Sequence, residues 1–257
     1  MAKLTIKGLQ ELKGKRKITV TTAEDAHTAR ACELAGIDNI VAYDVSVSVI
    51  ARAAPNTLIT MAMSFADARI SDETAVRAAA DLMAQGADLI YTMDMTPERV
   101  HVLSKQGIPC VGHVGFIPYM ASWIGGYKAV GKTALEAKAL FDKTRALEEA
   151  GAIAVEMECV PEQVAAEITK RLKKILIFSM GSGADCDGQY LFSCDLLGSH
   201  DGHYPRHAKK YGNFFEQSVD ILKQYKNDVT SGAYPEERNV IKMKDAEYRA
   251  FLDSLKR

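Results

Sequence analysis

Apolar and polar residues follow one repeating order along this chain: an amphipathic helical stretch, a glycine, and then a short apolar run. This unit occurs four times, around Gly36, Gly86, Gly107 and Gly151. A glycine directly after a helix accepts the left-handed backbone that ends it. The short run behind it is typical of a strand buried on both faces. The repeat therefore predicts alternating helices and strands around a parallel sheet, an α/β fold.

The same pattern predicts eight strands, but their number alone does not decide between an open sheet and a closed barrel. We expect the strands at Ile18–Thr22, Asn39–Tyr43, Thr57–Ala62, Leu89–Thr92, Cys110–His113, Ala152–Glu158, Ile175–Ser179 and Tyr190–Ser193. We expect the helices at Ala23–Ala35, Asp72–Gln85, Pro97–Lys105, Leu135–Ala150, Pro161–Lys173 and His207–Val229.

The chain is expected to form one domain over residues 1–257, a length that suits a single (β/α)8 barrel. No linker, low-complexity stretch or break in composition divides it. After Pro235, the apolar residues Tyr248, Phe251 and Leu252 recur at helical spacing. We therefore expect a C-terminal helical tail over residues 236–257, packed on the body of the protein or on a neighbouring subunit.

The composition limits which partners and which cellular location we expect. Hydrophobic residues make up 47% and charged residues 25%, which are globular averages. The formal net charge of -1 gives no electrostatic reason to expect a nucleic acid or an anionic membrane as partner. No apolar run approaches the roughly 18 residues of a membrane span, and the first residues lack the apolar core of a signal peptide. We expect a cytoplasmic protein whose five cysteines are reduced thiols.

Polar residues at the ends of the predicted strands are the candidates for chemistry, because parallel α/β folds bind ligands at the carboxyl ends of their strands. Asp44 ends an apolar run and either binds a cation or caps the next helix. His113 is open to a catalytic role or to a structural hydrogen bond. Residues 181–188 form a glycine-containing turn that could cradle an anion, although a plain tight turn is the stronger interpretation.

Two glutamates lie on the sixth predicted strand. Because side chains alternate along a strand, Glu156 and Glu158 share a face, so both point into the fold or both point out. A carboxylate inside an apolar barrel mouth has a raised pKa and can take a proton from carbon. The alternative is a structural ion pair with a lysine.

Five motifs in order resemble the ketopantoate hydroxymethyltransferase family, a (β/α)8 barrel family of the phosphoenolpyruvate mutase and isocitrate lyase superfamily. The resemblance runs from Ile18 to about Pro235 and implies a TIM barrel, Glu158 as the general base and a ring-like homo-oligomer. Its motifs are Gly112–Pro118 with Gly125–Gly131, Glu158–Pro161, Gly181–Gln189, Asp195–Gly198 and Ser231–Pro235.

The first half of the chain departs from the family pattern. The resemblance implies that a metal-ligand aspartate is kept as Asp44, whereas Ala62 stands where a second ligand aspartate belongs. Tyr91 replaces the lysine that holds the substrate carboxylate, and Met93 replaces a glutamate near the metal. About twenty residues of the family pattern are missing between residues 48 and 56.

These departures predict a changed metal and substrate site. We expect weak or absent Mg²⁺ binding by Asp44, with Asp67 or Asp94 as possible additional ligands. The substrate should still be a small acid, with its carboxylate held by Arg69, Tyr91 or backbone N–H groups in place of the lysine. The substrate-binding candidates are Tyr43, Ser46, Arg69, Tyr91, Lys128 and Ser182.

Three functions stay open. In the first, Glu158 forms an enolate for C–C bond formation or cleavage; in the family, the acceptor is 3-methyl-2-oxobutanoate, chelated by Mg²⁺, and 5,10-methylenetetrahydrofolate gives the one-carbon unit. Folate is needed only if that reaction is retained. In the second, Glu158 and His113 act without a metal, in a lyase, hydrolase or isomerase on another small acid. The third, ranked below both, is a non-enzymatic barrel for assembly or ligand sensing.

Overall fold

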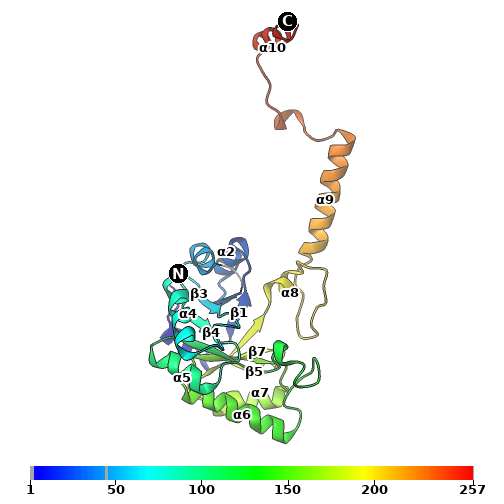
Figure 1. Cartoon of the computed structure of the whole chain (residues 1–257). Helices are drawn as coiled ribbons and strands as arrows, with labels where there is room; N and C mark the ends of the chain where they lie inside the picture. The colour runs from blue at the N-terminus through cyan, green and yellow to red at the C-terminus, as the bar shows by residue number, and fades with distance from the viewer. Residues whose placement is uncertain (1–2, 44–45, 257) are drawn as a thin grey trace.

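The computed structural model describes residues 3–43 and 46–256. Eight parallel strands close into a barrel in chain order, with β8 paired to β1, so the structure confirms the (β/α)8 TIM barrel (Figure 1). The strands are β1 Ile18–Thr22, β2 Asn39–Ala42, β3 Leu58–Ala62, β4 Leu89–Tyr91, β5 Cys110–Gly115, β6 Ala154–Glu158, β7 Leu176–Met180 and β8 Gly188–Leu191.

Helices connect most of the strands. The barrel helices are α1 Ile6–Gln10, α2 Ala26–Ala35, α3 Val47–Ala53, α4 Asp72–Ala84, α5 Pro97–Lys105, α6 Ala134–Glu149, α7 Glu162–Arg171 and α8 Ser193–Leu197. Short 3-10 helices lie at Pro118–Met120 and Glu237–Asn239, and β7 is joined to β8 by residues 181–187, all described, without a helix. Helices α1, α3 and α8 were not predicted, because five to seven residues are too few to show an apolar period.

The four glycines of the sequence repeat have the backbone that the pattern predicts. Their φ angles are 76° at Gly36, 114° at Gly86, 74° at Gly107 and 94° at Gly151. Residues with a Cβ rarely adopt these angles, so glycine ends each helix and turns the chain into the next strand. The repeat thus has a direct structural cause.

Side-chain oxygens begin several helices. Asp25, Ser71, Thr96 and Thr133 each accept a hydrogen bond from a backbone N–H in the first turn of α2, α4, α5 and α6. Each such cap stabilises its helix by about 1 kcal/mol.

The apolar core has two layers. One lies between the strands and the helices, and the other fills the barrel interior. Ala154 and Val111 belong to the interior layer. Because side chains alternate along a strand, Glu156, Glu158 and His113 point into the barrel as well. This answers the question that the sequence left open for the two glutamates.

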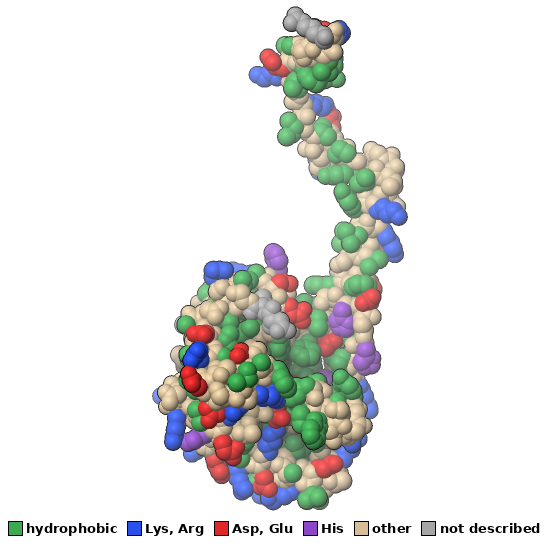
Figure 2. All heavy atoms as spheres, in the orientation of Figure 1, with side chains coloured by type: hydrophobic (Ala, Val, Ile, Leu, Met, Phe, Trp, Pro, Cys, Tyr) green, Lys and Arg blue, Asp and Glu red, His purple; other side chains and the backbone are tan. Residues whose placement is uncertain are grey.

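The chain beyond α8 leaves the barrel. Helix α9, Phe214–Ser231, projects away from it, and α10, Asp245–Ser254, lies at the far end (Figure 1). Neither of these two helices, described throughout, has a buried side chain. The helix expected over residues 207–229 therefore begins later, and the tail does not pack on the body of the same chain. Figure 2 shows hydrophobic side chains along this projecting segment. No described helix is both long enough and apolar enough to cross a bilayer.

Candidate active site

Four buried side chains form a continuous hydrogen-bonded row inside the barrel mouth. Nε2 of His113 lies 3.1 Å from Oε2 of Glu158. The hydroxyl of Tyr91 lies 2.7 Å from Nδ1 of His113 and 2.7 Å from Oε2 of Glu156. The exposed fraction of these residues is between 3% and 8%. Neighbouring strands β4, β5 and β6 supply them, so the order of the row follows from strand pairing.

The backbone around Glu158 is tightly constrained. A Cβ on Gly115 would lie 2.2 Å from the carbonyl oxygen of Glu158, so only glycine allows β5 and β6 to approach here. The next residue, Cys159, has a φ of 51°, a conformation that residues with a Cβ rarely adopt. Met93, after β4, has a φ of 55°. Strained backbone of this kind clusters at functional sites.

Burial sets the protonation of the row. It raises the pKa of Glu158 to about 7. It also raises the pKa of Glu156, an effect that the nearby His113 opposes. The pKa of His113 is lowered, chiefly by burial, with Glu156 acting in the opposite direction. A carboxyl group whose pKa lies near neutrality suits general acid–base chemistry, because both of its forms are populated.

Aromatic side chains line the mouth beside this row. The hydroxyls of Tyr43 and Tyr190 are 2.5 Å apart and hydrogen-bonded. The ring of Tyr43 stands edge-on to those of Tyr91 and Phe192. Burial raises the pKa of Tyr43, so its hydroxyl stays protonated. Tyr43 is thus placed next to the catalytic candidates, whereas Tyr190 carried no signal in the sequence beyond its position on a strand.

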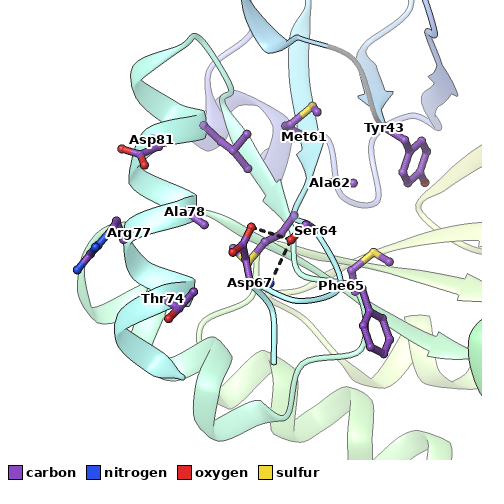
Figure 3. A pocket seen from close by; sticks show the side chains of 13 residues that line it. Tyr43, Met61, Ala62, Ser64, Phe65, Asp67, Thr74, Arg77, Ala78 and Asp81 are labelled. Atoms are coloured by element: carbon purple, nitrogen blue, oxygen red, sulfur yellow. Dashed lines mark hydrogen bonds between the residues drawn. The ribbon is translucent and has the colours of Figure 1, made fainter. Parts of the chain in front are cut away.

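A hollow of about 690 Å³ lies next to the mouth, between β3 and α4 (Figure 3). Tyr43, Ala62 and Met93 are among the residues that line it. Asp67 also lines it and accepts a 2.6 Å hydrogen bond from the hydroxyl of Ser64. The hollow therefore borders the strand ends at which the sequence departs from the family pattern.

Arg69 presents a partly free guanidinium after β3. Its Nη2 donates a 2.6 Å hydrogen bond to the hydroxyl of Tyr119, and its carbon lies 3.9 Å from the ring centre of Phe65. Its Nη1 is buried and has no hydrogen-bond partner among the described residues. A buried donor without a partner costs free energy, so a ligand oxygen would be stabilising here.

The remaining predicted residues are used in other ways or lie apart. The hydroxyl of Ser182 donates to the carbonyl of Met157 and accepts from the N–H of Val160, so it supports the turn after β6. Ser46 begins α3 at an exposed position, where its hydroxyl bonds to that of Ser48. Lys128 is exposed in the loop after β5.

The carboxylates expected to assist a metal are engaged by other groups. Asp94 forms a 2.5 Å ion pair with Lys143, and Asp67 is bound by Ser64. Ala62 and Met93 offer a methyl group and a thioether, which are not ligands for Mg²⁺. Asp44 lies outside the described residues. The described residues after β3 and β4 therefore do not fit a Mg²⁺ ion.

Two other groups of described residues bring ligand-type atoms within 4.8 Å of one another. His113, Glu156 and Glu158 form the row described above, and hydrogen bonds account for their arrangement without an ion. In the second group, Asp195 is 3.0 Å from His200. Burial raises the pKa of the adjacent Cys194 thiol, which disfavours the thiolate that a metal requires.

Residues 43–237 match the ketopantoate hydroxymethyltransferase family. The chain belongs to this family. It is 34% identical to the 3-methyl-2-oxobutanoate hydroxymethyltransferase of Thermotoga maritima, over 92% of this chain and 96% of that protein. It is 35% identical to the enzyme of that name from Geobacillus sp. (strain WCH70), over 91% of this chain and 92% of the relative.

Solved structures of other enzymes share the fold. A phosphonopyruvate hydrolase complex with oxalate and Mg²⁺ aligns over 99% of both chains, with a TM-score of 0.55 and 13% identity. A 2,3-dimethylmalate lyase, a PEP mutase/isocitrate lyase superfamily member, aligns over 100% of this chain and 98% of its own, with a TM-score of 0.54 and 12% identity. The family and an enzyme of the hydroxymethyltransferase-like class are thereby confirmed, and the solved structures confirm the fold.

Proposed function

We propose that this protein uses Glu158 as a general base to form an enolate from a small keto or carboxylic acid, with C–C bond formation or cleavage. One observation carries the proposal: the carboxylate of Glu158 ends β6 inside the mouth, bonded to His113, with a pKa raised to about 7. Such a group takes a proton from carbon near neutral pH and can return it.

In the proposed chemical step, Glu158 and His113 are the two side chains that handle the proton. A proton leaves the carbon beside the carbonyl for an oxygen of Glu158, and the C–H electron pair becomes the enolate. His113 contacts Oε2 of Glu158 and orients the carboxylate. In the direction of bond formation, the enolate then attacks a one-carbon electrophile; methylenetetrahydrofolate supplies it only if the family reaction is retained.

The substrate is proposed to differ from 3-methyl-2-oxobutanoate. Ala62 and Met93 border the hollow beside the mouth, and neither provides a hard oxygen ligand. Arg69, whose Nη1 has no hydrogen-bond partner among the described residues, is the proposed anchor for a substrate carboxylate, because the hydroxyl of Tyr91 is already held by His113 and Glu156. The same residues favour the second candidate function, a lyase, hydrolase or isomerase on another small acid with weak or no Mg²⁺ dependence.

A paired assay tests the proposal. Ketopantoate formation is measured with Mg²⁺, without it and with EDTA, and a panel of small 2-oxo acids is screened for C–H exchange in D₂O. We expect little ketopantoate under any of the three conditions and metal-independent exchange for at least one other acid. Robust Mg²⁺-dependent ketopantoate synthesis would restore the ordinary family reaction and contradict a changed substrate.

We also infer a homo-oligomer in which the projecting tail packs on another copy of the chain. Helix α9 exposes Ile221, Leu222 and Tyr225 by 56–66%, and α10 exposes Tyr248 and Phe251 by about half. Exposed apolar surface of this extent is typical of an interface. Light scattering at micromolar concentration should give a multiple of the 28.1 kDa chain mass, and a monomer would contradict the inference.

A further inference from the structure

We propose that Glu156 and Glu158 share one proton through Tyr91 and His113, and that Glu156 holds this proton whenever Glu158 is the ionised base. The proposal rests on the proposed function only in taking Glu158 as the base. Glu156 and Tyr91 then act as positioning residues, because they reach the reacting atoms through His113.

A count of hydrogens supports the shared proton. Three hydrogen bonds join the four groups of the row, and each bond needs one hydrogen. The hydroxyl of Tyr91 and a neutral imidazole supply two of them. The third hydrogen must therefore come from Glu156, from Glu158 or from a doubly protonated His113. When all three bonds are formed, the row therefore holds one proton more than it would with both glutamates ionised and His113 neutral.

The position of this proton decides the state of Glu158. If Glu158 holds it, Glu158 donates to Nε2 of His113, Nδ1–H donates to Tyr91, and Tyr91 donates to Glu156. If Glu156 holds it, every bond reverses: Glu156 donates to Tyr91, Tyr91 donates to Nδ1, and Nε2–H donates to ionised Glu158. Only the second arrangement leaves a neutral His113 beside an active base.

The surroundings disfavour other sites for the proton. Burial lowers the pKa of His113, so the imidazolium is unfavourable, and the effects of Lys143 and Asp94 on it oppose each other. Tyr43, Tyr190 and Cys159 also face the carboxylates, and burial raises the pKa of each, so that they stay neutral. The two glutamates are thus the groups between which the proton can move.

The transfer balances without any other reactant. As the O–H bond of Glu158 breaks, an N–H bond forms at Nε2 of His113. The bond from Nδ1 to hydrogen breaks as an O–H bond forms at Tyr91, and the original O–H bond of Tyr91 breaks as one forms at Glu156. One proton moves from Glu158 to Glu156, and no electron leaves the row. The transfer leaves Glu158 ionised before it accepts a proton from the substrate.

Spectroscopy on the intact protein tests this without a substrate. At about pH 8, infrared spectra should contain the carbonyl band of a protonated carboxyl group that is lost in Glu156→Gln. Nitrogen NMR of ¹⁵N-histidine protein should show His113, assigned by its loss in His113→Asn, as the neutral Nε2–H tautomer. Absence of the band, its persistence in Glu156→Gln, or the Nδ1–H tautomer would overturn the proposal, as would a tightly bound metal ion found by elemental analysis.

Two tyrosine variants separate the relay from general packing. Tyr91→Phe removes the middle link, so His113 should become a mixture of tautomers. Tyr190→Phe is the matched control, because Tyr190 is equally buried but bonds to Tyr43 outside the row. An unchanged tautomer in Tyr91→Phe would contradict the relay. If Tyr91→Phe does not fold, the spectra of the wild type, Glu156→Gln and His113→Asn still decide.

The pH profile of C–H exchange links the relay to turnover. In Glu156→Gln, a neutral amide takes the place of the protonated carboxyl group, so the acid limb of the profile, which reports Glu158, should stay within about half a pH unit of wild type. A limb moved to lower pH by about one unit would show an ionised Glu156 beside Glu158 in the wild type and would contradict the shared proton. If no acid is turned over but the spectra agree with expectation, the proposed function fails and the shared proton stands.

Discussion

The two sides of the barrel mouth are built differently. On the side of β5 and β6, His113, Glu156 and Glu158 are buried and bonded to one another or to Tyr91. On the side of β3, Ala62 borders an open hollow, and Arg69 retains a donor without a described partner. In the proposed function, proton transfer and substrate anchoring therefore fall on separate strands, so one can change while the other is kept.

Backbone constraints make the β5–β6 side sensitive to substitution. Gly115 permits the close approach of the two strands, and Ser182 joins the end of β6 to the start of the turn that follows. A substitution in this region disturbs several bonds at once. The residues that border the hollow have open space on one side, so a different side chain there causes fewer steric clashes.

The largest expected effect is on the β6 side. Glu158→Gln keeps the shape of the side chain but removes the proton acceptor, so exchange and turnover should fall by about 10²–10⁴-fold. Thermal melts should show an intact fold, and the exposed Glu149→Gln is a control that should keep full activity. Full activity in Glu158→Gln would transfer the role of base to another group, first of all to Glu156.

The hollow side can be tested by adding the carboxylate that the family pattern has there. Ala62→Asp places an oxygen ligand at the end of β3, beside the hollow, and should raise the affinity for Mg²⁺ by about 10–100-fold. Isothermal titration with MgCl₂ measures this gain. If the wild-type protein already binds Mg²⁺ as tightly as the variant, the two sides differ less than proposed.

The proposed anchor should have a smaller effect, confined to binding. Arg69→Lys keeps the charge but loses the planar pair of donors, so KM for the acid substrate should rise about tenfold with little change in kcat. Tyr119→Phe removes the hydroxyl that holds Arg69 and controls for its positioning. An unchanged KM in Arg69→Lys would place the carboxylate elsewhere, for example at backbone N–H groups.

Most of the fold could be predicted because its signals are local. The glycines that end helices and the apolar runs behind them lie next to each other in the chain, so the repeat was visible. The helix over residues 207–229 was placed too early because tertiary packing intervenes: His207 lies against Gly181 of the barrel, and helix α9 begins only at Phe214.

The site could be predicted only in part, because only some of its signals are local in the sequence. The ends of strands drew attention to Glu158 and His113, and a spacing of two residues placed Glu156 on the same face. The contact between Tyr91 and Glu156 depends on the register across three strands and on the rotamers inside the barrel. No sequence spacing contains that information.

A further expected effect is on stability, and it compares the two sides directly. The pKa of Glu158 is raised from 4.5 to about 7 in the folded state. Between these values the unfolded chain ionises and the folded one does not, so this group's contribution to stability falls as pH rises to about 7. Glu158→Gln has no such titration. Its free energy of unfolding relative to wild type should therefore rise by up to about 3 kcal/mol between pH 4.5 and 8.

Thermal melts at several pH values measure the difference, which should appear as a rise of several degrees in the relative Tm of Glu158→Gln. Groups common to both proteins cancel in this comparison. Asp67→Asn is the matched variant on the hollow side; its carboxylate bonds to Ser64 at an exposed position, so its relative Tm should show no comparable gain with pH. Equal pH trends in the two variants would mean that Glu158 is no more desolvated than Asp67, and the distinction between the two sides of the mouth would be lost.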